Sequence, residues 1–343
     1  MNTVAVVGID LAKQVFQIHF ADEFGNKLLN KQVRRSKLLS ALNQLPPCLV
    51  GMEACGSSHY WAREIRALGH EVKLMAPQYV KAYVKTNKND SADAEAIAEA
   101  VTRLGMRFVD IKNADQQSVL LLHREREGLT RERTSLINRI RGTLSEFGVI
   151  IPKGPNKLKV WFRDEYSRHE AALPSILQRH TQRLLQRLRS LEGSIAALDE
   201  EIDAESQSDE ACRRLEEVPG IGRLTASALR ASVGNARSFK NGREFAAWLG
   251  LVPRQYSSGG KQRLLGISKR GDAYLRRMLI HGARAVLRHM NPKRSVTPWL
   301  DSLSRRRHRN VVIVALANKL ARIAWALLFH QRRYEEQYLV TAM

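Results

Sequence analysis

Two aspartates three residues apart open an alanine-rich stretch, KNDSADAEAIAEA, at residues 88–100. If a helix begins here, Asp90 and Asp93 lie on the same face of it. One interpretation is structural, because aspartate at a helix start accepts hydrogen bonds from free N–H groups and meets the positive end of the helix dipole. The other interpretation is a metal site, because hard divalent cations prefer carboxylate oxygens as ligands.

Two further carboxylates stand at the ends of apolar runs. TVAVVGID ends on Asp10, and CLVGMEA carries Glu53 near its end. Both runs predict buried strands. Neighbouring strand ends and an adjoining helix start can gather four carboxylates, whose mutual repulsion divalent cations would relieve. Two cations roughly 4 Å apart could assist the attacking and leaving oxygens of a phosphodiester. For each carboxylate taken alone, a helix cap or a solvated charge is the simpler explanation.

The elements around these carboxylates alternate between strand and helix. The pattern predicts a meander of three strands, then helix, strand, helix, strand and helix, over residues 3–10, 15–22, 27–33, 36–45, 48–54, 58–68, 71–76 and from 91 onward. Pro46 and Pro47 would stop the first of these helices. The order β-β-β-α-β-α-β-α resembles the ribonuclease-H-like fold, in particular the branch similar to the Holliday-junction resolvase RuvC.

Composition favours a protein of two or three domains with a real core, because the chain has 343 residues of which 44% are hydrophobic. No apolar run approaches the roughly 18 residues of a membrane span, and the first residues lack the features of a signal peptide. A cytoplasmic protein without a membrane partner is expected. Cys48, Cys55 and Cys212 form no C-x-x-C pair and are expected in the core, not in a disulfide or zinc site.

Positive charge is concentrated at one end of the chain. The formal net charge is +22, and residues 211–343 hold 26 of the basic residues against 7 acidic ones. Such a surface attracts polyanions, of which nucleic acid is the foremost. A ribosome-like binding protein without chemistry and a membrane-surface protein are the alternatives that charge alone leaves open.

The middle of the chain, residues 114–202, predicts two long helices. Apolar residues in the second of them, from Leu177 to Ile202, follow the spacing of a heptad seam. The two helices could fold back as an antiparallel hairpin within one subunit or pair between subunits. A passive spacer and a dimerisation device are both compatible with this pattern.

The segment EEVPGIGRLTASALRASVG, residues 216–234, has the pattern of a helix-hairpin-helix. Gly220 and Gly222 would form a turn whose backbone N–H groups, at a helix start beside Arg223, suit a phosphate. The alternative is an ordinary packing unit of two helices.

A segment rich in glycine, serine and basic residues follows, GLVPRQYSSGGKQRLLGISKRG at residues 250–271. Composition alone favours a flexible turn. A catalytic serine would also need activation, and no histidine or aspartate lies within local reach.

Taken together, GIDLAKQVF, GMEACGSSHYWAREI, KNDSADAEAIAEA and the C-terminal motifs resemble the DEDD insertion-sequence transposases, the Piv/MooV-like group of bridge-RNA-guided recombinases. The resemblance implies a RuvC-like domain whose DEDD set is Asp10, Glu53, Asp90 and Asp93, with Mg²⁺, or else Mn²⁺, as cofactor. It implies mobile-element and target DNA and a guide (bridge) RNA as partners. It also implies a coiled coil that helps to assemble a homodimer or homotetramer.

The same family carries a nucleophilic serine before a glycine in a P-x-x-x-x-S-G segment. Ser258 fits this pattern, and Ser257 is the alternative because the serine is doubled. The cations that would hold the phosphate and stabilise developing negative charge are Lys261, Arg263, Lys269 and Arg270.

These observations predict a transposase with three parts: a RuvC-like metal-binding domain at 1–110, a helical coiled-coil region at 111–210, and a mainly α C-terminal domain at 211–343. Ser258 would attack DNA to give a 5′ or 3′ phosphoserine link, with the carboxylates and magnesium assisting the leaving oxygen. The expected location is the bacterial cytoplasm, at the nucleoid during action. A structure-selective resolvase without the serine and a non-catalytic nucleic-acid scaffold are the competing hypotheses.

Overall fold

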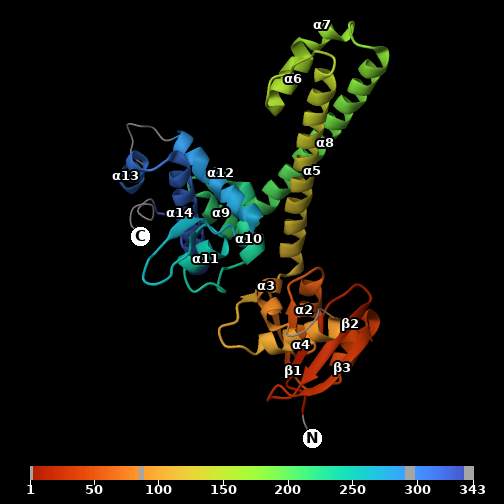
Figure 1. Ribbon diagram of the computed structural model, residues 1–343, viewed down its shortest axis with the longest axis vertical. Coiled ribbons are helices and arrows are strands. Elements are labelled where there is room, and N and C mark those ends of the chain that lie inside the picture. Colours follow the sequence, from red (N-terminus) through yellow and green to blue (C-terminus); the bar gives the residue numbers. More distant parts are fainter. Residues whose placement is uncertain (1–2, 85–88, 290–297, 336–343) are drawn as a thin grey trace. The chain divides into compact units, whose positions relative to one another are not determined.

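The protein is described here by a computed structural model that places residues 3–84, 89–289 and 298–335. It divides into two compact units, Met1–Ala114 and Asp115–Met343. Figure 1 colours the first unit from red to orange and the second from yellow to blue. The first unit is mixed α/β, and the second is mostly helical.

The first unit is built on a six-stranded mixed sheet with the order β3-β2-β1-β4-β5-β6. Strands β1, β4 and β5 run parallel to one another, whereas β2 is antiparallel to β1 and β3, and β6 is antiparallel to β5. The first five strands and the initial meander are confirmed as the sequence predicted them. The strands are β1 (Val6–Asp10), β2 (Val15–Ala21), β3 (Lys27–Arg34), β4 (Leu49–Glu53), β5 (Glu71–Met75) and β6 (Phe108–Val109).

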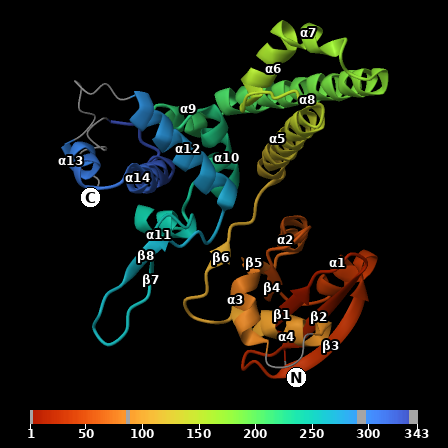
Figure 2. The same ribbon diagram turned by 45° about the horizontal axis from the view of Figure 1, so that its top comes forward.

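Helices pack on both faces of this sheet (Figure 2). Because side chains alternate between faces along a strand, β1 directs Val7 and Ile9 to one face and Val6, Gly8 and Asp10 to the other. Helices α1 and α2 pack on the first face, and α3 and α4 on the second. These helices are α1 (Leu38–Leu42), α2 (Ser58–Ala67), α3 (Pro77–Val80) and α4 (Asp90–Val101), with 3₁₀ turns at Arg35–Lys37 and Lys81–Tyr83.

Two details differ from the sequence expectations. The helix expected at 36–45 is a 3₁₀ turn followed by the five residues of α1, because the chain already turns at Leu45, whose N–H donates to the Leu42 carbonyl. The cysteines also differ from one another. Cys48 and Cys212 are buried as expected, but Cys55 is exposed in the loop after β4.

Two long helices of the second unit pair with each other. Arg126 of α5 pairs with Asp199 of α8, and Glu132 pairs with Arg187, so residue numbers rise along one helix as they fall along the other. The pairing is therefore antiparallel and lies within one chain. Leucines and isoleucines of both helices form a shared apolar cluster with Trp161. The helices of this region are α5 (Ala114–Ser145), α6 (Pro155–Asp164), α7 (Tyr166–Glu170) and α8 (Ser175–Ser208).

The remaining helices pack around α14, which supplies much of the buried C-terminal core. In the described part of the chain, α14 is the one helix long and apolar enough to cross a membrane, and more than half of its apolar stretch is buried inside the unit. A core helix has the same length and composition, so α14 gives no argument for a membrane. The helices are α9 (Glu210–Glu216), α10 (Arg223–Val233), α11 (Gly242–Trp248), α12 (Ala273–His289), α13 (Pro298–Arg306) and α14 (Arg309–His330).

The segment expected to be a flexible loop forms a β-hairpin instead. Strands β7 (Pro253–Gln255) and β8 (Leu264–Ile267) pair antiparallel between α11 and α12. The hairpin is called the ribbon below, and it extends away from the helices of its unit (Figure 2).

A buried histidine joins three helices of the second unit. His123 of α5 lies with its Nδ1 3.0 Å from the Tyr274 hydroxyl of α12 and its Nε2 3.2 Å from the Ser227 hydroxyl of α10. Only 2% of the residue is exposed. Burial, with the nearby charge of Arg126, lowers the pKa of His123 to about 4. The imidazole is therefore neutral at physiological pH.

This burial predicts an acid-sensitive core. Because the folded-state pKa is lower than that of an unfolded histidine, the stabilisation is complete above pH 6.5 and is lost as pH falls toward 4. The shift corresponds to on the order of 3 kcal/mol. Chemical denaturation, followed by tryptophan fluorescence, should show the wild type losing stability relative to His123→Gln over this window. A difference between the two proteins that does not change with pH would contradict a buried neutral histidine.

Candidate active site

Asp10 and Glu53 end two strands that lie side by side. In the parallel pairing of β1 with β4, Ile9 is opposite Met52, so the next residues along each strand are these two carboxylates. Asp10 shares a face with Gly8, and Glu53 shares that same face with Gly51, because both pairs are two residues apart. This register agrees with the expectation from the sequence that Asp10 and Glu53 lie at neighbouring strand ends. Both are half-buried.

Helix α4 begins with the other two carboxylates, and neither is needed to cap it. The N-cap is Asn89, whose side-chain oxygen accepts a hydrogen bond of 2.8 Å from the Ala92 N–H. Asp90 follows it as the first helical residue and is exposed, whereas Asp93 is half-buried in the same first turn. A good cap already exists, so the structural explanation of this aspartate pair is weakened. The capping asparagine was overlooked in the sequence, although its residue type just before an alanine-rich helix was a usable signal.

The path of α4 over the sheet depends on two glycines. A Cβ atom at Gly8 would lie 2.2 Å from the Ala94 carbonyl oxygen and 2.8 Å from the Ala98 Cβ. A Cβ atom at Gly51 would lie 2.9 Å from the Cβ of Val101. All three distances are too short for real atoms. The helix therefore lies directly on β1 and β4, on the face that carries Asp10 and Glu53.

A polar network tethers the start of α4 to the sheet. Asn30 of β3 donates from Nδ2 to the Ser91 hydroxyl at 2.9 Å and to the Ser91 carbonyl at 3.2 Å. Its side-chain oxygen accepts a hydrogen bond from the amide of Gln17, the residue that pairs with Asp10 across β1 and β2. His19, whose pKa is lowered chiefly by burial, lies with its Nδ1 3.3 Å from Nδ2 of Asn30. These residues orient the helix end that carries the aspartates.

The four carboxylates suit a hard divalent cation in their chemistry, but they are not drawn into one tight cluster. Among the residues that the structure describes, no group of three or more histidine, cysteine, aspartate and glutamate side chains could hold a metal ion. Asp10 and Glu53 follow residues that pair between neighbouring strands. Desolvation, followed by the negative charges of Glu53 and Asp10, raises the pKa of the nearby Cys55 thiol. Two of the four expected ligands, Asp10 and Glu53, therefore end neighbouring strands. The other two, Asp90 and Asp93, lie in the first turn of α4.

The doubled serine lies at the tip of the ribbon, where the two hydroxyls differ. Ser258 and Lys261 flank a turn made by Gly259 and Gly260, which both have positive φ, as a type I′ hairpin turn requires. The Ser257 hydroxyl accepts a hydrogen bond from the Gln255 side-chain amide at 3.0 Å and another from the Arg263 backbone N–H at 3.3 Å. Ser258 makes no side-chain hydrogen bond within the described residues and is exposed.

The cations expected to bind phosphate fall into two groups. Lys261 and Arg263 lie on the ribbon close to Ser258, whereas Lys269 and Arg270 lie at its root. All four are exposed, and none pairs with a carboxylate in the part of the chain that the structure describes.

The turn at 219–222 has a packing explanation for one of its glycines. A Cβ atom at Gly220 would lie 2.9 Å from Val286 and 3.1 Å from the Gly282 carbonyl of α12. Gly222 is exposed and begins α10 without a side-chain cap. Arg223 pairs with Asp203 at 3.1 Å and lies 3.6 Å from Glu216, so its guanidinium already has anionic partners.

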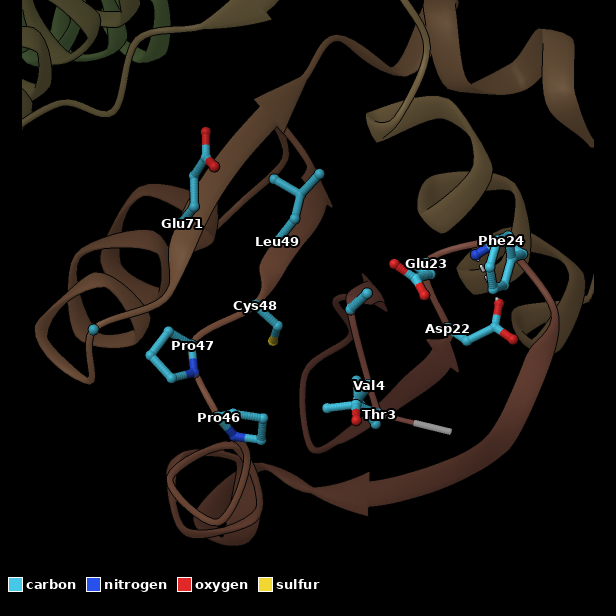
Figure 3. A pocket seen from close by; sticks show the side chains of 12 residues that line it. Thr3, Val4, Asp22, Glu23, Phe24, Pro46, Pro47, Cys48, Leu49 and Glu71 are labelled. Carbon is cyan, nitrogen blue, oxygen red and sulfur yellow. Dashed lines mark hydrogen bonds between the residues drawn. The ribbon is translucent and has the colours of Figure 1, made fainter. Parts of the chain in front are cut away.

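A pocket of about 710 Å³ lies at the other end of the strands, away from these carboxylates (Figure 3). It lies beside the starts of β1, β4 and β5, and Glu23, Cys48 and Glu71 are among its lining residues. None of the residues predicted for catalysis lines it.

Comparisons with known proteins identify the family of this chain. Residues 212–297 match the family described as transposase IS116/IS110/IS902, and residues 7–149 match the DEDD transposase family of IS110. A probable family 20 transposase of Pseudomonas aeruginosa is 51% identical over 330 residues, which cover 96% of this chain and 98% of the relative. The transposase of the element IS1328 from Yersinia enterocolitica is 44% identical, with 95% and 97% covered. That of IS1111A from Coxiella burnetii is 42% identical, with 97% and 92% covered.

An α/β unit with carboxylates at adjacent strand ends, matched by a DEDD transposase domain, suggests a ribonuclease-H-like nucleic-acid enzyme of the kind that generally uses divalent metal ions. The relatives are more specific. The chain belongs to the IS116/IS110/IS902 family of insertion-sequence transposases, which are enzymes that cut and rejoin DNA. The family resemblance inferred from the sequence motifs is confirmed.

The close approach of α4 predicts a strong effect of a single methyl group. Gly8→Ala should displace α4 and cost about 2 kcal/mol of unfolding free energy, because the added Cβ meets backbone atoms of the helix. Amide hydrogen exchange of the α4 peptide should become faster. Gly56→Ala is the matched control, because a Cβ atom there meets nothing within 4 Å. Equal exchange of α4 in both variants would contradict the packing described here.

Proposed function

We propose that this transposase cuts DNA with Ser258 as the nucleophile and with Asp10, Glu53, Asp90 and Asp93 as the ligands of Mg²⁺, for which Mn²⁺ could substitute. The observation that carries the proposal is the shared α4 face of the sheet. Asp10 and Glu53 end adjacent strands on this face, and the helix packed on it begins with both aspartates. Bound there, the cation would polarise the scissile phosphate and stabilise the leaving oxygen.

In the proposed cleavage step, the Ser258 oxygen forms a bond to phosphorus as the phosphorus–oxygen bond to one deoxyribose breaks. The serine proton is given up to a base, and the leaving deoxyribose oxygen is stabilised and then protonated. The link to serine conserves the phosphodiester, so attack by a new deoxyribose hydroxyl can reseal the strand and free the serine. The exposed, unbonded hydroxyl of Ser258 supports this role, whereas the Ser257 hydroxyl is held by the ribbon.

We infer a RuvC-like catalytic domain at 1–110, a coiled-coil region at 111–210 and a basic domain at 211–343 with a helix-hairpin-helix at Gly220 to Arg223. The partners would be mobile-element and target DNA and a guide RNA, bound by a homodimer or homotetramer at the nucleoid. The excess of basic residues after position 210 supports nucleic-acid binding.

The test is a covalent adduct. Wild-type protein, incubated with magnesium and a nicked DNA target, should give a protein–DNA adduct on a denaturing gel, and Ser258→Ala should give none while it still binds DNA. Alanine removes the attacking oxygen at an exposed position and little else, so the loss should be in chemistry and not in folding. Ser257→Ala, the matched control, should keep the adduct.

The other outcomes each identify a different mechanism. An adduct that survives Ser258→Ala and disappears in Ser257→Ala would move the nucleophile by one residue. Free nicked ends without an adduct would favour a resolvase that uses the carboxylates and water. Binding without cleavage in magnesium would favour a scaffold.

A further inference from the structure

The ribbon exposes large apolar side chains among cations. Tyr256 is 72% exposed, Leu264 63% and Leu265 40%. Residues 250–271 also carry five basic side chains and no acidic one. Exposed apolar groups gathered on one small element mark an interaction surface, and the charge restricts the partner to an anion.

The pairing of the ribbon decides which of these side chains share a face. Ser258 pairs with Lys261, and the Tyr256 N–H donates to the Arg263 carbonyl at 2.9 Å. Because cross-strand partners share a face and the face repeats every second residue, Tyr256, Ser258, Lys261 and Arg263 lie together. We call these four residues the serine face. Gln255 pairs with Leu264, so Leu264 belongs to the opposite face.

The root of the ribbon is held firmly. A Cβ atom at Gly250 would lie 2.1 Å from the Arg270 carbonyl oxygen, and one at Gly271 would lie 1.7 Å from the Trp248 carbonyl oxygen. Arg276 of α12 donates to the carbonyls of Leu249 at 2.9 Å and Arg270 at 3.2 Å. The serine face is therefore presented from a fixed base and not from a loose loop.

We propose that Tyr256 is a positioning residue that stacks on an unpaired nucleobase beside the phosphate taken by Ser258, while Lys261 and Arg263 contact the phosphate backbone. This inference rests on the proposed role of Ser258. Tyr256 and Ser258 stand two residues apart on one strand face, about 7 Å along the ribbon. That separation suits neighbouring groups of a single nucleic-acid strand.

The occupant is a locally unpaired strand, because an aromatic ring can stack only on a base whose own face is free. Base–aromatic stacking tolerates any sequence and contributes about 1–3 kcal/mol per base. The two cations and the absence of acids on the segment complement the phosphates of such a strand.

The test uses the full-length protein and a single-stranded oligonucleotide with 2-aminopurine at one position, whose fluorescence is quenched by stacking. Quenching by the wild type should disappear in Tyr256→Ala, with affinity roughly 5- to 150-fold weaker. Tyr256→Phe should keep both the quenching and the affinity, because it keeps the ring. Leu264→Ala, which removes another well-exposed apolar side chain, from the opposite face, should behave as the wild type does.

Several results would overturn the proposal. Unchanged quenching in Tyr256→Ala, an equal loss in Leu264→Ala, or a loss in Tyr256→Phe would each exclude stacking by the ring. If Tyr256→Ala changed the self-association of the protein and left oligonucleotide binding unchanged, stacking by the ring would also be excluded. The same titration with Ser258→Ala separates this proposal from the previous one. Stacking should persist in that variant whether or not serine is the nucleophile.

Discussion

The absence of a side chain at position 8 is the constraint on which the first unit depends. With hydrogen at that position, α4 lies directly on β1, and its Ala94 carbonyl occupies space that any other residue would fill. This contact fixes the helix on the face of the sheet that carries Asp10 and Glu53. The Asn30 hydrogen bonds to Ser91 then fix the end from which Asp90 and Asp93 project. Carboxylates far apart in the sequence are thereby directed to one side of one sheet.

Glycine also permits close backbone packing at the root of the ribbon, but here the packed root supports an exposed tip. Glycines at its root allow backbone segments to approach closely, and Arg276 bridges their carbonyls. Its tip, by contrast, is covered by nothing else among the residues that the structure describes. In the proposed mechanism, a firm base below an exposed tip would present Ser258 accurately while a nucleic-acid strand could still reach it. The buried neutral His123 similarly sets a junction of three helices without leaving a charge in the core.

Much of the first unit could be predicted from the sequence, because continuous apolar runs identify buried strands and place Asp10 and Glu53 at their ends. The tether from Asn30 could not, because it depends on the register of β3 against β2 and on a helix sixty residues later. The ribbon was missed because glycine and serine content was taken as flexibility, although two glycines between alternating residues is a hairpin signal. The ion pairs of Arg223 were likewise invisible, since Asp203 lies on another helix.

The measurement that tests the central claim most directly is the position of the bound cation. Iron(II) bound in place of magnesium generates hydroxyl radicals with ascorbate and peroxide, and these break the backbone near the metal. The account predicts that breaks, mapped by mass spectrometry, fall at the ends of β1 and β4 and at the start of α4, and that excess Mg²⁺ suppresses them. Breaks concentrated around Glu23 and Glu71, at the opposite end of the sheet, would contradict it.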